Sequence, residues 1–413
     1  MRTTAPEADA LAPPPGHPRF AAADGLRAVA ITCVIAVHAW AATTAVAGSA
    51  PDDGLSNRLL AHLNVGVAIF FGLSGFLLYR PFVAGDFALG PRPAVVSYGW
   101  RRALRILPAY WLALAVLALV PGATARAGDG VWALLPLQGL APAGERSCVQ
   151  LIASCRLAPL WSLTVELTFY ALLPAYAALM RNVPRRRRLV SEGLALGALA
   201  ALSTALAVLP EFAGSALVNG TVAGHFAPFA FGMFAAVLSA GPSERLSSRA
   251  WARAPLFAGV AALLVYLITA LTLPPSPFVL TASDRLMAHL AFAAIAALAL
   301  IPVVVDRPLP HARALLSSRP LRAIGLVSYG LFLWHYTFAL AAVDLGIASW
   351  PLAFAFVSAC SLAPAVASYL LVEKPALRLK SRWLGRAPTA HRRQPQSLTR
   401  ARPSPPAVAL RDN

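Results

Sequence analysis

The sequence predicts an all-α membrane protein, a polytopic transmembrane helical bundle of about ten membrane-spanning helices with both termini cytoplasmic. Hydrophobic residues make up 58% of the 413 residues and charged residues only 13%, and the mean hydropathy is +0.65. This composition is typical of helical membrane proteins and not of soluble domains. The net charge of +18 could indicate nucleic-acid binding. The arginines lie between apolar segments, however, so no nucleic-acid partner is expected.

Ten apolar segments are predicted to span the bilayer. They lie at residues 26–46, 62–80, 104–121, 159–180, 189–209, 221–240, 254–273, 284–305, 325–345 and 350–372. With a cytoplasmic N-terminus, the inner segments hold 29 of the 35 Lys and Arg residues and the outer segments hold five. Positive residues accumulate on the cytoplasmic side of membrane proteins, so this asymmetry fixes the predicted orientation. The expected location is the plasma membrane, as a multi-pass protein.

The chain is expected to have one folded domain, over residues 24–378. Residues 1–23 are predicted to be a disordered cytoplasmic leader, because they lack the pattern of a cleaved signal peptide. Residues 379–413 are rich in Pro, Arg and Ser, and are predicted to be a disordered, basic cytoplasmic tail near anionic lipid. No second soluble domain is expected after the membrane domain.

The first span carries ionisable residues, in the stretch that begins at Asp24 and ends at His38. From Arg27 to His38 a helix makes about three turns plus roughly 20°, so both side chains share one face, roughly 16 Å apart along the axis. Asp24 falls on nearly the same face. Ionisable groups in a membrane span are functional candidates by default. The alternative is that Asp24 and Arg27 cap the helix and that His38 is a packed neutral imidazole.

The second span contains Gly72-Leu73-Ser74-Gly75. The nucleophile pattern G-x-S-x-G would require glycine where Phe76 stands, so Ser74 is not expected to be a nucleophile. The small residues are instead expected to allow close helix packing.

A basic cluster precedes the third span, where Arg101, Arg102 and Arg105 leave the cytoplasmic surface beside Trp100 and Tyr110. The planar guanidinium fork suits phosphate, which favours a phosphate-bearing ligand. The alternative is that the cluster only anchors the topology. The run from Arg185 to Arg188 is predicted to be such an anchor against anionic lipid.

The long outer loop at 122–158 contains Cys148 and Cys155, which are expected either to form a small disulfide or to remain unpaired thiols. Cys33 and Cys360 are expected to be small apolar fillers within helices. No metal site is predicted, because no histidine pair has the i,i+4 spacing of a helical zinc site.

The fourth span opens at Trp161 and holds Glu166, the one acidic residue well inside a predicted span. Counted from the outer helix ends, Glu166 lies roughly 10 Å deep and His38 roughly 12 Å deep. We therefore expect the two to meet, with the carboxylate orienting His38 as a general base. The alternative is a buried structural pair. In the ninth span, Tyr329 and His335 are expected to line a polar pocket.

Six motifs in this order resemble the acyltransferase-3 family of integral membrane O-acyltransferases, over about residues 20–378. They are DGLR followed by the R-x10-H spacing (24–38), FFGLSGFLL (70–78), RRALRILPAY (101–110), LWSLTVELTFY (160–170), SYGLFLWH (328–335) and EKP (373–375). One departure is Leu167, where many members have a second acidic residue.

The resemblance implies transfer of an acyl group from acyl-CoA to a hydroxyl of a sugar or sugar-bearing acceptor. It implies that His38, Arg27 and Glu166 are catalytic, and that the basic cluster lies near the CoA site. Asp24, Trp161, Tyr329 and His335 are candidate pocket residues. Acyl-CoA, with acetyl-CoA expected, would be a co-substrate, with no permanently bound cofactor. The alternative function is a carrier or flippase for a lipid-linked sugar, which would leave acyl-CoA unchanged.

Overall fold

The computed structural model describes residues 21–48, 51–119, 135–137, 140, 158–213, 215–240, 253–275, 280–305 and 314–378. This part of the chain is helical and contains no strand, which confirms the predicted all-α bundle. Most of the predicted leader, the basic tail and both cysteines of the outer loop lie outside the described residues. Helix α1 already begins at Ala21, inside the stretch predicted to be a disordered leader.

Seven described helices are long and apolar enough to cross a membrane, with an eighth if two helices joined at a 70° bend form one span. The bent pair is α14 (Arg319–Leu326) and α15 (Ser328–Asp344). Two further predicted spans are helical: α10 (Phe226–Ala240) is shorter, and α4 (Val95–Ala118) carries three arginines. The membrane bundle is thus confirmed, whereas the number ten and the cytoplasmic termini stay predictions.

The remaining long helices complete the bundle. They are α1 (Ala21–Ala47), α3 (Val65–Asp86), α6 (Trp161–Arg181), α7 (Arg185–Val208), α11 (Ala254–Thr272), α12 (Ala282–Val304) and α16 (Trp350–Ser368). Short elements join them: α2 (Leu55–Ala61), η1 (His62–Asn64), η4 (Ala158–Leu160), α8 (Pro210–Ala213), α9 (Ala216–Gly220), η5 (Val222–Gly224) and the π-helical turn η9 (Tyr369–Glu373).

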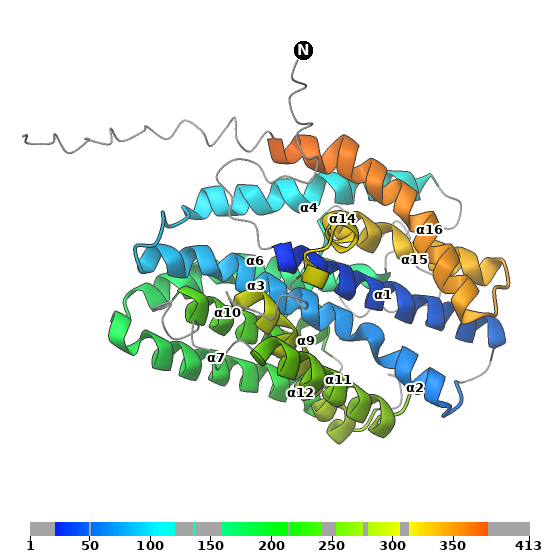
Figure 1. The fold of residues 1–413 in the computed structure, drawn as a ribbon, viewed down its shortest axis with the longest axis horizontal. Coiled ribbons are helices and arrows are strands. Elements are labelled where there is room, and N and C mark those ends of the chain that lie inside the picture. The colour runs from blue at the N-terminus through cyan, green and yellow to red at the C-terminus, as the bar shows by residue number, and fades with distance from the viewer. Residues whose placement is uncertain are drawn as a thin grey trace, which may run out of the picture.

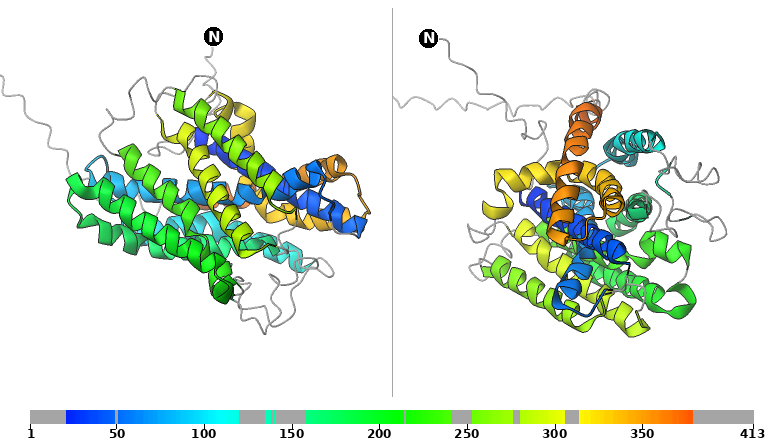
Figure 2. Two further views of the ribbon diagram at one scale, coloured as in Figure 1. Left: turned by 90° about the horizontal axis from the view of Figure 1, so that it is seen from below. Right: turned by 90° about the vertical axis from the view of Figure 1, so that its right-hand side faces the viewer.

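Two packed groups of helices share α1 and α3 at the centre of the molecule (Figure 1). Helix α1 packs against α3, α14, α15 and α16, while α3 packs against α10, α12 and α6. The end-on view in Figure 2 shows α4 and α16 on the opposite side of α1 from α11 and α12. The candidate site lies where α1, α3, α4, α6 and α15 converge.

Glycines let the central helices approach closely, as the small residues of the second span predict. A Cβ at Gly75 of α3 would lie 2.3 Å from the carbonyl oxygen of Phe229 of α10. On α1, a Cβ at Gly25 would lie 1.9 Å from the carbonyl oxygen of Leu316. Gly25 therefore brings the Asp24–Arg27 turn directly against the segment that precedes α14.

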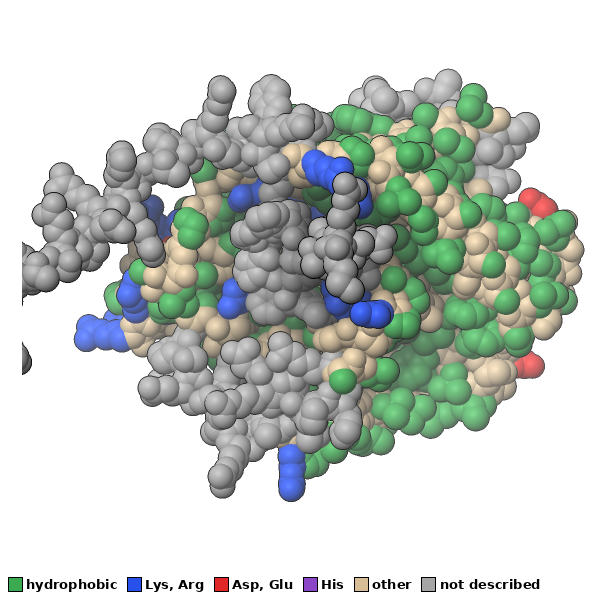
Figure 3. All heavy atoms as spheres, turned by 45° about the horizontal axis from the view of Figure 1, so that its top comes forward, with side chains coloured by type: hydrophobic (Ala, Val, Ile, Leu, Met, Phe, Trp, Pro, Cys, Tyr) green, Lys and Arg blue, Asp and Glu red, His purple; other side chains and the backbone are tan. Residues whose placement is uncertain are grey.

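Hydrophobic side chains cover much of the described surface on the face that Figure 3 shows. In Figure 3, exposed Lys and Arg side chains lie over the left and middle of the view, whereas acidic side chains lie at its right edge.

The sequence predicts that the run from Arg185 to Arg188 anchors the protein against anionic lipid. Arg188 is instead buried inside the protein, with 3% exposure. Its Nε donates a 2.8 Å hydrogen bond to Glu192, which is fully buried in α7 and accepts a second bond from the Tyr176 hydroxyl at 2.5 Å. Arg188 also pairs with Asp86 at 3.2 Å. Glu166 is therefore not the one acidic residue inside the bundle, and Arg188 joins α3 to α7 in addition to any role in topology.

Candidate active site

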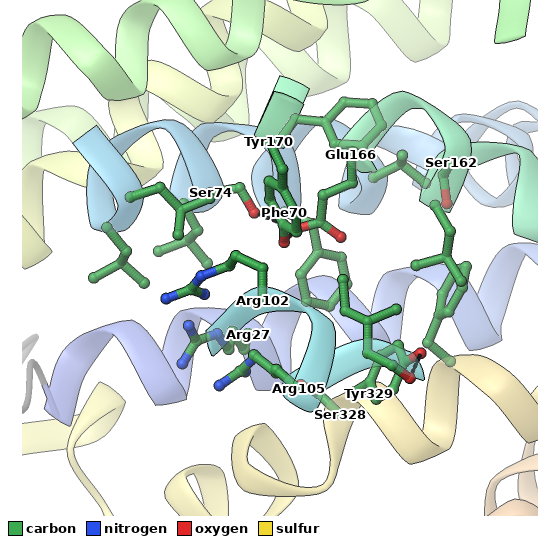
Figure 4. Close-up of a pocket in the computed structure, with 18 residues that line it drawn as sticks. Arg27, Phe70, Ser74, Arg102, Arg105, Ser162, Glu166, Tyr170, Ser328 and Tyr329 are labelled. Atoms are coloured by element: carbon green, nitrogen blue, oxygen red, sulfur yellow. Dashed lines mark hydrogen bonds between the residues drawn. The ribbon is translucent and has the colours of Figure 1, made fainter. Parts of the chain in front are cut away.

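A pocket of about 820 Å³, its open mouth included, lies among five helices near the N-terminal end of α1. Apolar side chains from α3, α6 and α15 form much of its wall. Its polar side chains are Arg27, Ser74, Arg102, Arg105, Ser162, Glu166, Tyr170, Ser328 and Tyr329. Figure 4 shows these groups converging from separate helices.

Three guanidinium groups gather on one side of the pocket, from Arg27 of α1 and from Arg102 and Arg105 of α4 (Figure 4). Arg27 pairs with the buried Asp24, with 2.8 Å between Nη1 and Oδ1. The Nε of Arg102 is buried and makes no hydrogen bond within the described part of the chain. Burying an unpaired donor is costly, so this cationic wall is suited to an anionic ligand that supplies the missing acceptors.

Glu166 faces the same pocket and is held by two hydroxyl groups. Ser74 Oγ of α3 donates to its Oε1 at 2.6 Å, and the Tyr170 hydroxyl, one turn further along α6, donates to the same oxygen. Hydrogen bonds to an ionised carboxylate are among the stronger ones in proteins. The bond from Ser74 connects α3 to α6 across the pocket.

Glu166 and His38 do not form the expected contact. Within the described chain, each makes its hydrogen bonds to other residues. Counting residues from the start of the fourth span does not show which neighbouring helices cover it. Ala158, Pro159 and Leu160 are buried before α6 begins. Thr164 donates to the carbonyl of Pro136 at 2.9 Å, so further chain covers this end of the helix. Glu166 lines the same pocket as Arg27, whereas His38 is not among the residues that line it.

His38 lies further along α1 and contacts a second imidazole. His38 Nδ1 is 2.8 Å from the carbonyl oxygen of Val34 and 3.2 Å from Nε2 of His335. His335 is fully buried in α15, with Nδ1 2.8 Å from the carbonyl oxygen of Phe332. Neither imidazole is among the residues that line the pocket, but Phe332 lines it and contacts the His335 ring, with 5.8 Å between ring centroids. The histidine pair thus lies behind one wall of the pocket.

The other predicted site residues divide between the pocket and its surroundings. Tyr329 lines the pocket and donates its hydroxyl to the carbonyl of Ile106 at 2.9 Å. Arg101 does not line the pocket, although Arg102 and Arg105 do. Trp161 also lies outside it and packs against the ring of His225, with centroids 5.0 Å apart.

Sequence reasoning missed Ser74 and Tyr170 as partners of Glu166. The contact of Tyr170 with Glu166 could have been predicted from their spacing. Residues four apart on a helix are neighbours, and a carboxylate in a membrane helix needs hydrogen-bond donors. Ser74 gives no such signal, because its partner Glu166 lies 92 residues away on another helix.

Comparison with known proteins identifies the family. The acyltransferase-3 family model, described as an acyltransferase domain, matches residues 20–370. The chain belongs to the acyltransferase-3 family. This confirms the resemblance carried by the six motifs and identifies the chain with a family of integral membrane acyltransferases. No solved structure matches the chain.

Two curated relatives cover different shares of the chain. The peptidoglycan O-acetyltransferase OatA of Listeria monocytogenes is 26% identical over 331 residues, which is 76% of this chain and 48% of that protein. Nodulation protein 10 of Rhizobium leguminosarum bv. viciae is 31% identical over 156 residues, which is 32% of this chain and 38% of that protein. The matched segments thus cover less than half the length of either relative.

Proposed function

We propose that this protein is a plasma-membrane O-acyltransferase that moves an acyl group from acyl-CoA to a hydroxyl of a carbohydrate, glycolipid or glycosylated or macrocyclic metabolite. The simplest donor is acetyl-CoA. The observation that carries the proposal is the cationic wall of Arg27, Arg102 and Arg105 in a pocket enclosed by membrane helices. Membership of the acyltransferase-3 family supports the reaction type.

The cationic wall binds the phosphates of CoA. Arg102 and Arg105 lie on one face of α4, and Arg27 faces them from α1, so two helices can grip one polyanion. Guanidinium groups bind phosphate through paired hydrogen bonds, and the buried Nε of Arg102 has no partner among the described residues. The charge asymmetry of the sequence supports a cytoplasmic position for this wall.

Glu166 positions the arginines of the cationic wall and does not orient His38. Its carboxylate accepts hydrogen bonds from the hydroxyls of Ser74 and Tyr170 and lines the same pocket as Arg102. A carboxylate beside Arg102 restrains that guanidinium and offsets part of its charge when the pocket holds no phosphate. Asp24 does the same for Arg27 through their 2.8 Å pair.

His38 is the general base. The acyl-pantetheine arm extends from the cationic wall past Phe332 toward the histidine pair. Nε2 of His38 takes the proton of the acceptor hydroxyl while the hydroxyl oxygen attacks the thioester carbonyl. The C–S bond then breaks, the acyl group stays on the acceptor oxygen, and the CoA thiolate recovers the proton from the His38 imidazolium. The reaction needs no reactant other than acyl-CoA and the acceptor.

The named activity of one relative agrees with this reaction class. OatA is described as a peptidoglycan O-acetyltransferase, and it matches 76% of this chain. For this protein, a hydroxyl acceptor and an acetyl donor are proposed on that basis, and the acceptor's identity is left to experiment.

Two measurements test the function. The purified protein should release free thiol from acetyl-CoA when a hydroxyl-bearing acceptor fraction is added, whereas a carrier would leave acetyl-CoA intact. Mass spectrometry of lipids, glycans and metabolites from wild-type and deletion cells should show a species that differs by one acyl group. Transport of a lipid-linked sugar without thiol release would overturn the proposal.

A further inference from the structure

The contact between His335 and His38 links a fully buried side chain of α15 to the proposed base on α1. We propose that His335 is a positioning residue, which holds His38 in the tautomer whose Nε2 is free to accept a proton. The inference rests on the proposed function, because it assigns a role relative to His38 as the base. It concerns the orientation and protonation of one ring and not contact with substrate.

The hydrogen bonds of His335 define its own tautomer. Nδ1 lies 2.8 Å from the carbonyl oxygen of Phe332 and 3.2 Å from that of Leu331. Carbonyl oxygens can only accept, so Nδ1 of His335 carries the hydrogen. The ring is fully buried, and a charged imidazolium there without an anionic partner would be costly. The neutral ring therefore has an acceptor lone pair on Nε2, the atom that faces His38.

The same reasoning extends to His38. Its Nδ1 faces two acceptors, the carbonyl oxygen of Val34 at 2.8 Å and Nε2 of His335 at 3.2 Å. Nδ1 of His38 must therefore be the protonated nitrogen. The lone pair is then on Nε2, which makes no hydrogen bond within the described part of the chain. This nitrogen is the one that a general base needs.

The surrounding rings fix the plane of the base. His335 lies edge-on to His38 at a centroid distance of 4.9 Å, and Tyr336 of the same helix contacts it edge-on at 5.1 Å. The Val34 carbonyl belongs to the same helix as His38, so the contact from α15 is what fixes the ring relative to another helix. In hydrolases a carboxylate performs this task. A neutral imidazole performs it here and brings no net charge into the membrane.

This arrangement also defines what His335 does during the reaction. When His38 takes a proton at Nε2, its Nδ1–H becomes a stronger donor to Nε2 of His335. The imidazolium is stabilised by that bond and by the Val34 carbonyl. His335 needs an acceptor atom at this place and nothing else, so a glutamine should replace it better than a leucine of similar size.

The test compares His335→Gln with His335→Leu in the full-length protein in lipid nanodiscs. Glutamine can present its Oε1 to Nδ1 of His38, whereas leucine removes the acceptor. With acetyl-CoA as donor, we expect kcat to fall at least about tenfold in His335→Leu and to be largely retained in His335→Gln. KM for acetyl-CoA should stay within about twofold in both, because the cationic wall is unchanged. Equal losses of kcat in the two variants, or no loss in His335→Leu, would overturn the proposal.

A second readout does not depend on turnover. The ¹⁵N spectrum of histidine-labelled protein, with the His38 signals assigned by their loss in His38→Ala, reports which nitrogen is protonated. Wild type and His335→Gln should show protonated Nδ1, and His335→Leu should show a mixture of tautomers. If wild-type His38 is protonated at Nε2 instead, the inference fails even where the protein consumes acyl-CoA. If His38→Ala keeps its turnover, the proposed base fails, whatever the spectrum shows.

Discussion

Ser74 of α3 donates a 2.6 Å hydrogen bond to Glu166 of α6, and this bond joins two helices across the candidate pocket. A serine beside a carboxylate in a pocket could be a nucleophile. The effect of replacing Ser74 is therefore compared with the effect of replacing the proposed base, His38. If Ser74 only supports Glu166, Ser74→Ala should reduce kcat by no more than about 30-fold, because it removes one hydrogen bond of about 1 to 2 kcal/mol. Initial rates of thiol release measure this. A loss as complete as that of His38→Ala, together with a burst of acyl-enzyme, would identify Ser74 as the nucleophile instead.

The cationic wall should determine the affinity for the donor. Arg102→Gln should raise KM for acyl-CoA by about 10- to 100-fold with a smaller effect on kcat, because it removes charge-assisted bonds of about 1.5 to 3 kcal/mol to phosphate. Arg101→Gln is the matched control, since Arg101 neighbours Arg102 in sequence but does not line the pocket. Steady-state kinetics against acyl-CoA distinguish them. Equal effects of the two variants would contradict this phosphate site.

Close approach at Gly25 should limit what this position tolerates. Gly25→Ala would place a Cβ 1.9 Å from the carbonyl oxygen of Leu316, and the forced shift should cost about 1 to 3 kcal/mol of stability. Gly259→Ala in α11 is the control, because nothing lies within 4 Å of its added Cβ. Thermal unfolding in detergent should show a lower midpoint for Gly25→Ala than for wild type. The midpoint of the control should be unchanged. A midpoint for Gly25→Ala at the wild-type value would show that α1 is not packed this closely.

The buried pair of Arg188 and Glu192 should stabilise the junction of α3 and α7. Glu192→Leu leaves Arg188 without its 2.8 Å partner and should cost about 3 to 5 kcal/mol, the usual penalty for breaking a buried ion pair. Arg186→Gln changes an exposed arginine of the same run and should shift stability by no more than about 0.5 kcal/mol. Thermal unfolding of both variants tests the pair. Similar small shifts would mean that the whole run is only a topology anchor.

Much of the fold follows from composition and periodicity, because long apolar helices are the main solution for a chain that must satisfy its backbone in lipid. Arg27 and the arginines of α4 were found for the same reason, since charge in or beside a span is costly and stands out. Their convergence in one pocket agrees with that reading, although Arg101, which shares a face with Arg105 by spacing, lies outside it.

The errors have one physical origin, the offset between helices along the bundle axis. Residue counting along one helix does not specify its register against the neighbouring helices, and α6 follows the buried residues Ala158 and Leu160. The pairing of Glu166 with His38 was therefore wrong, and the partners Ser74 and Tyr170 were missed. The contact of His38 with His335 depends on the register between α1 and α15, which neither helix's own sequence specifies.

The central claim is that His38 is the base of an acyl-CoA-dependent transfer. The most direct test measures acceptor-dependent thiol release from acetyl-CoA by purified wild type and His38→Ala, with His289→Ala as a histidine control outside the pocket. We expect turnover of His38→Ala to fall by at least about 100-fold, with binding of CoA unchanged and with the control near wild type. Turnover of His38→Ala close to that of wild type would contradict the account.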